Sequence, residues 1–122
     1  MPSFGRASRA RLDTCDTKIQ DVLGEAIKDF DFSVICGTRG KEKQNKAYES
    51  GHSQLQWPNS KHNSTPSKAV DIVPWPGGFD NDDATFYKMA TYIYKAANTL
   101  GVQITWGGHW TFKDLAHFQL ED

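Results

Sequence analysis

The sequence predicts an α+β fold, a small antiparallel sheet packed by helices in a single domain that spans residues 1–122. Three observations support this. The chain of 122 residues has the length of one ordinary domain. Two long segments carry apolar residues at helical spacing. Four short runs read as strands, and no repeat, low-complexity tract or linker interrupts them.

The first half of the chain predicts a helix, a strand and a polar helix. Asp16 is a suitable N-cap for a helix that runs to about Asp29. Residues 32–36, FSVIC, form a short strand that a glycine ends. Residues 41–50 form a polar helix, closed by Gly51 at the position where helices favour a left-handed residue. The apolar face of the first helix comprises Ile19, Val22, Leu23, Ala26, Ile27 and Phe30.

The second half predicts three further strands around the longest helix. Residues 52–67 are rich in serine, asparagine, histidine and proline and form an irregular loop. Residues 68–73 form a strand, which a proline stops. A capped helix spans about residues 84–100 and ends at a glycine. Residues 102–106 and 116–120 form the last two strands.

Composition narrows the classes of partner. Fourteen basic and fifteen acidic residues leave a formal charge of −1, so the chain lacks the electrostatic footprint of a nucleic-acid-binding protein. The N-terminal stretch has no apolar run of about 7–15 residues and is not a signal peptide. No segment approaches the ~20 apolar residues of a membrane span, so we expect no membrane insertion. Cys15 and Cys36 are expected to be free thiols in a reducing cytosol, although the sequence leaves their pairing open.

Four polar residues at predicted strand edges suggest a metal site. A carboxylate in a buried strand, such as Asp71, costs several kcal/mol unless it is paired. His62, Asp71 and His117 together are a ligand set of catalytic zinc, which leaves one position for water. Asp114 then serves as the general base for that water. The spacing also fits a hydrogen-bonded core histidine, a turn-capping Asp71 and a loop-stabilising Asp114.

Several motifs in order resemble one enzyme family. The segment SKHNSTPSKAVDIVP resembles the zinc D-Ala-D-Ala carboxypeptidase, VanY-like and dipeptidase families. GTRGKEKQNKAYESGHS and WGGHWTFKDLAHFQL, with the opening FGRASRARLDTCDTKIQDVLGEAI, are similar to the phage L-alanyl-D-glutamate endopeptidase endolysins across nearly the whole chain. The resemblance implies the hedgehog and D-Ala-D-Ala peptidase-like fold.

The resemblance implies a role for each matching residue. His62, Asp71 and His117 are expected to be the Zn²⁺ ligands, with Asp114 as the general base. Arg39 is expected to stabilise the oxyanion or hold a substrate carboxylate. Gln44 is expected to bind substrate or support that arginine, unless it is a helix surface residue. Ser60 is expected to contact substrate or a ligand, unless it is a turn residue.

Two departures from the family pattern stand out. The ligands His62 and Asp71 are separated by eight residues, more than the family's compact spacing, so the extra residues are expected to bulge outward. His109 stands where relatives commonly carry aspartate, either at the surface, facing substrate, or as a competing ligand. His52 has no assigned role. Trp106 is expected to pack in the core, and the role of Trp110 as a cleft wall stays open.

The implied function is zinc-dependent hydrolysis of the L-Ala-D-Glu amide bond in the stem peptide of peptidoglycan. The alternatives are a D-Ala-D-Ala carboxypeptidase or dipeptidase, and a non-catalytic zinc-containing module that binds peptidoglycan. The resemblance further implies a monomer without a separate wall-binding domain. It would be made in the host cytoplasm and act on periplasmic peptidoglycan after holin release.

Overall fold

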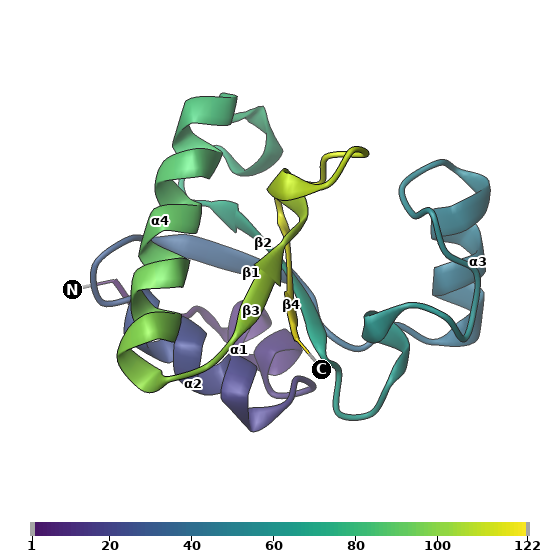
Figure 1. Ribbon diagram of the computed structural model, residues 1–122, viewed down its shortest axis with the longest axis horizontal. Coiled ribbons are helices and arrows are strands. Elements are labelled where there is room, and N and C mark those ends of the chain that lie inside the picture. Colours follow the sequence, from purple (N-terminus) through teal and green to yellow (C-terminus); the bar gives the residue numbers. More distant parts are fainter. Residues whose placement is uncertain (1, 122) are drawn as a thin grey trace.

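The computed structural model describes residues 2–121, which form a four-stranded sheet with helices packed against it (Figure 1). The strand order is β1-β2-β4-β3, and every neighbouring pair is antiparallel. The α+β fold and all four predicted strands are therefore confirmed. The strands are β1 Phe32–Cys36, β2 Ala69–Pro74, β3 Ile104–Trp106 and β4 His117–Leu120.

Three α-helices surround the core and one stands apart. Helix α1 packs against β1, α2 packs against α4, and α4 packs against β2 and β3, whereas α3 lies away from them on the right of Figure 1. Asp16 caps α2 by accepting a hydrogen bond from the backbone of Lys18, as expected for an N-cap. Gly101 ends α4 in the left-handed conformation. The helices are α1 Arg6–Leu12, α2 Thr17–Ala26, α3 Lys41–Glu49 and α4 Asp83–Leu100, with single 3₁₀ turns η1 Lys61–Asn63, η2 Gly78–Asp80 and η3 Gly107–His109.

Helix α1 was not predicted. Its sequence, RASRARL, contains three arginines and one large apolar residue, so it lacks an apolar stripe. Leu12 is fully buried in the core, and the Ser8 hydroxyl accepts a hydrogen bond from the backbone of Val34. Tertiary contacts with β1 therefore stabilise a helix that the local sequence pattern does not predict.

Strand register prepares the functional site. Asp71 in β2 pairs with His117 in β4, so both side chains leave the same face of the sheet. The pairing of β1 with β2 shifts between Val34 and Cys36, and this irregularity sets Cys36 opposite Asp71. Three chemically active side chains thus form a row across three strands. Among residues 2–121, no helix is both long enough and apolar enough to cross a membrane.

Candidate metal centre and catalytic cleft

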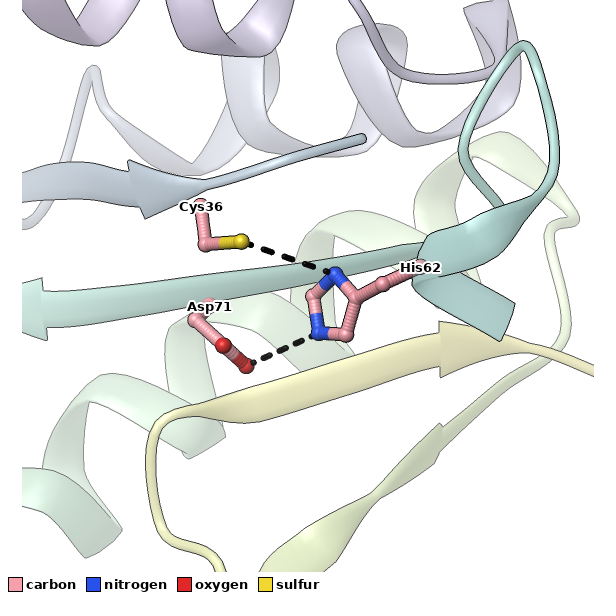
Figure 2. Close-up of side chains that lie close together, drawn as sticks. All are labelled: Cys36, His62 and Asp71. Carbon is pink, nitrogen blue, oxygen red and sulfur yellow. Dashed lines mark hydrogen bonds and ion pairs between the residues drawn. The ribbon is translucent and has the colours of Figure 1, made fainter. Parts of the chain in front are cut away.

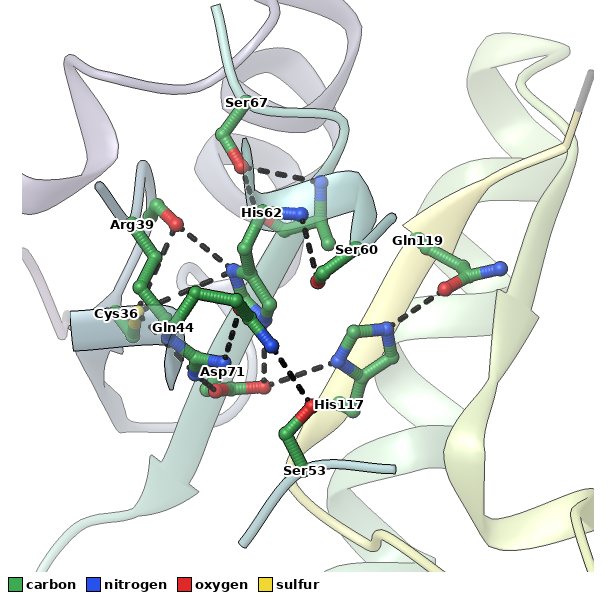
Figure 3. Close-up of polar contacts among 12 residues, drawn as sticks. Cys36, Arg39, Gln44, Ser53, Ser60, His62, Ser67, Asp71, His117 and Gln119 are labelled. Atoms are coloured by element: carbon green, nitrogen blue, oxygen red, sulfur yellow. Dashed lines mark hydrogen bonds and ion pairs between the residues drawn. The ribbon is translucent and has the colours of Figure 1, made fainter. Parts of the chain in front are cut away.

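Asp71 is the centre of the candidate site. Its Oδ1 atom lies 3.4 Å from His62 Nε2 (Figure 2) and 3.2 Å from His117 Nδ1 (Figure 3). Its other oxygen, Oδ2, accepts a hydrogen bond of 3.2 Å from Arg39. Burial opposes ionisation of Asp71, but the hydrogen bond from His117 and the charge of His62 outweigh it and hold the pKa of Asp71 well below its usual range. The structure therefore brings together the three predicted ligands and the predicted arginine.

Each of the two histidines turns one ring nitrogen toward Asp71. His62 Nδ1 donates to the carbonyl of Gly37 over 2.8 Å, which leaves Nε2 facing Asp71. His117 Nε2 lies 2.8 Å from Gln119 Oε1, which leaves Nδ1 facing Asp71. Outer-shell acceptors of this kind fix the tautomer of metal-binding histidines.

One buried nitrogen in this group makes no hydrogen bond in the described part of the chain and has only its ion-pair contact with Asp71. His62 is only 2% exposed, and within residues 2–121 its Nε2 makes no hydrogen bond. An unsatisfied buried polar atom is costly and is rare in native proteins. Two imidazole nitrogens and a carboxylate are a donor set that suits zinc. The residues present therefore fit a metal ion held by His62, Asp71 and His117.

Cys36 extends this group on the far side of His62. Its sulfur lies 3.9 Å from His62 Nδ1 (Figure 2) and 3.7 Å from an Arg39 nitrogen. Cys36, His62 and Asp71 form one cluster of candidate ligands, with ligand atoms within 4.8 Å of one another. Because Nδ1 is the nitrogen that donates to Gly37, Cys36 lies behind the imidazole and not on its metal-binding side. Cys36 and Cys15 are both free thiols, as predicted.

Asp114 reaches the site from the loop between η3 and β4. Its carboxylate forms a second candidate cluster with Asp71 and His117. Burial, followed by the negative charge of Asp71, raises the pKa of Asp114, and the charge of His117 opposes this shift. Gly107 explains part of the WGG motif, because a Cβ at Gly107 would overlap the backbone of Asp114. The Asp114 backbone N–H donates to the Gly107 carbonyl over 3.0 Å, which positions the carboxylate.

Gln44 is the buried support of Arg39. Its side chain is 0% exposed, so it lies below the cleft surface and takes the arginine-supporting role among the three expected for it. Its Oε1 accepts a hydrogen bond from Arg39 (Figure 3) and another from Asn63, both over 3.1 Å. Its Nε2 donates to Ser53 Oγ and to the Leu55 carbonyl. One amide thus joins Arg39 to the loop that follows α3.

A cleft of about 430 Å³ opens over these groups. The predicted residues along it are Arg39, Ser60, His62, Asp71, Asp114 and His117. Ser60 also caps η1 by accepting a hydrogen bond from the His62 backbone, so it positions a ligand. The sequence did not predict that Lys61, Leu55, Phe112 and Gln119 line the cleft. In the sequence, Leu55 and Phe112 are large apolar residues in segments expected to be loops, and this was the available signal for them.

The structure also shows where the remaining tryptophans and histidines of the sequence predictions lie. Trp106 is 5% exposed and packs in the core, and Trp110 lines the cleft with its ring 4.9 Å from that of His117. His109 packs on Trp106 in a separate groove with α4, so it is not a competing ligand. His52 lines the cleft. Between His62 and Asp71, residues 65–66 are exposed.

Comparisons with known proteins agree with this geometry. The family model described as phage L-alanyl-D-glutamate peptidase matches residues 2–120. The chain is similar to the crystal structure of the Serratia marcescens L-Ala D-Glu endopeptidase ChiX, with 30% sequence identity and a TM-score of 0.83. The match covers 97% of this chain and 89% of that chain. A search of curated proteins found no match. Since the family model spans nearly the whole sequence, the chain belongs to the phage L-alanyl-D-glutamate peptidase family.

Proposed function

We propose that this protein is a zinc-dependent peptidoglycan endopeptidase that hydrolyses the amide bond between L-Ala and D-Glu in the stem peptide. The observation that carries the proposal is the convergence of His62 Nε2 and His117 Nδ1 on Asp71, with Arg39 and Asp114 in the same cleft. Family membership indicates which amide bond is cut. The two imidazoles and the carboxylate indicate that the metal is zinc.

The chain's own residues divide the work of hydrolysis. His62, Asp71 and His117 would hold the zinc ion, which would supply Lewis-acid polarisation and a lowered pKa of water. Asp114 accepts a proton from the attacking water and returns it to the leaving amine nitrogen, a role suited to its raised pKa. Arg39, held by Asp71 and Gln44, donates hydrogen bonds to the carbonyl oxygen as negative charge develops there.

Metal content and mutation test the assignment together. The purified protein is expected to contain stoichiometric zinc, which His117→Ala removes. Asp114→Asn is expected to keep the zinc and to lose at least about 100-fold in rate, the usual contribution of general acid–base catalysis. Asp29→Asn, at an exposed position outside the cleft, is the matched control. Full activity in Asp114→Asn, or activity without any divalent metal, would contradict the proposal.

We further propose the biological setting that the sequence resemblance implies. The protein acts as a monomeric single catalytic domain, made in the host cytoplasm and delivered to periplasmic peptidoglycan by a holin. Expression in a Gram-negative host tests this point. Lysis is expected when the protein is co-expressed with a holin, and none when it is expressed alone. Lysis of equal speed without the holin would contradict the proposed delivery.

A further inference from the structure

Two exposed apolar side chains stand at the mouth of the catalytic cleft. Leu55 is 46% exposed and Phe112 is 48% exposed, and both line the cleft that contains Asp71 and His117. They come from two separate loops, one after α3 and one between η3 and β4, which face one another in Figure 1. Large apolar side chains left exposed beside a concave site commonly mark a ligand contact.

The backbone beneath Leu55 is fixed, although its side chain is exposed. The Leu55 carbonyl accepts a hydrogen bond of 2.6 Å from the buried Gln44 and another of 3.1 Å from Ser53 Oγ. The Leu55 N–H donates back to Ser53 Oγ over 3.1 Å. Because Gln44 also holds Arg39, the exposed Leu55 side chain and the catalytic arginine share one support. Such a contact surface is formed before substrate arrives, which lowers the entropic cost of binding.

The loop that carries Phe112 is also closed. The Gly107 carbonyl accepts hydrogen bonds from the backbones of Trp110 and Asp114, so the two ends of the loop meet at one residue. Phe112 is at the tip of this short loop, between the cleft wall formed by Trp110 and the general base Asp114. The two apolar side chains are therefore carried by two hydrogen-bonded loops that line the same cleft as the reacting groups.

We infer that Leu55 and Phe112 form the apolar subsite for the L-alanyl side of the scissile bond. This inference rests on the proposed function. The two sides of that bond differ in chemistry, since the alanyl side presents a methyl group and the glutamyl side carries a carboxylate. A carboxylate between two apolar side chains would lose hydration without a partner. The carboxylate instead matches the positive charge of Lys61, which lines the same cleft.

Rates on synthetic stem peptides test the inference. The probes are N-acylated peptides with L-Ala or Gly before D-Glu, and a third with D-isoglutamine in place of D-Glu. The wild type is expected to favour Ala over Gly by about tenfold in kcat/KM, the range for one methyl group in an apolar site. The double variant Leu55→Ala/Phe112→Ala is expected to reduce this preference to about twofold. Its preference for D-Glu over D-isoglutamine should match that of the wild type.

A matched control separates the subsite from general surface effects. Tyr48 is 43% exposed, a fraction close to that of Leu55, and it lies on α3 outside the cleft. Tyr48→Ala should therefore keep both preferences. An unchanged Ala-to-Gly preference in the double variant, or a change confined to the D-Glu preference, would overturn the inference. If the wild type does not cleave any of these peptides between the first and second residues of the peptide, the proposed function fails as well.

Discussion

Replacement of Gln44 by methionine tests whether a buried amide positions the catalytic arginine. Methionine preserves the length of the side chain but removes four hydrogen bonds, to Arg39, Asn63, Ser53 and Leu55. Each net hydrogen bond contributes about 0.5–1.5 kcal/mol. All four partners keep a second hydrogen bond, for example Arg39 with Asp71, so the lower part of that range applies. The expected loss in the free energy of unfolding is therefore about 2–4 kcal/mol.

The Gln44→Met substitution should also reduce activity, independently of its effect on stability. With Gln44 replaced, Arg39 keeps its bond to Asp71 but loses the acceptor that fixes its other nitrogen. A displaced positioning group costs on the order of 100-fold, so kcat/KM is expected to fall about 10- to 100-fold with normal zinc content. Chemical denaturation and peptide hydrolysis, measured well below the unfolding transition, check the two effects.

Gln20→Met is the matched control for this experiment. Gln20 makes one hydrogen bond, to the Cys15 carbonyl over 2.9 Å, and lies outside the cleft. It should lose about 1 kcal/mol of stability and no activity. The reasoning would be refuted if Gln44→Met stayed within about 0.5 kcal/mol and twofold of the wild type.

Three further predictions concern the metal centre. Gln119→Ala removes the acceptor for His117 and should weaken zinc binding about 10- to 100-fold in a chelator competition, whereas the exposed Gln103→Ala should not. In metal-free protein, iodoacetamide should label Cys36 before Cys15, since burial raises the pKa of Cys15 to about 11 while His62 and Arg39 outweigh burial and lower that of Cys36; equal labelling would contradict this. Burial lowers the pKa of His62, but the hydrogen bonds and charges of Asp71 and Cys36 outweigh burial and raise this pKa to about 10. Because the pKa is higher in the folded state, metal-free protein should lose stability against urea as the pH rises from 6.5 to 10. A flat or rising stability over that range would contradict the assigned charge state.

Much of the site could be predicted because its residues lie on regular strands. Side chains alternate along a strand, so a strand over residues 116–120 puts His117 and Gln119 on one face, where the structure joins them by a hydrogen bond. The strand around Asp71 was predicted from its apolar run and its proline. Family motifs then supplied Arg39, which lies in a loop where local pattern carries little information.

The remaining features depend on tertiary contacts. The register shift that sets Cys36 opposite Asp71 has no local signature in FSVIC. Gln44 lies on a helix whose other residues are not buried, so its burial follows from the Ser53–Leu55 loop folding over it. Helix α1 depends on contacts with β1. Each of these features joins segments that are distant along the chain or irregular in conformation.

Digestion of purified Gram-negative sacculi, with the products identified by mass spectrometry, tests the central claim most directly. The account predicts fragments with a new D-glutamyl amino terminus, released by the zinc-loaded protein and lost on chelation. Restoration of zinc should restore the same fragments. Release of free D-alanine, or cleavage at any other bond, would contradict the proposed specificity. Intact sacculi after treatment with zinc-loaded protein would contradict the proposed enzyme itself.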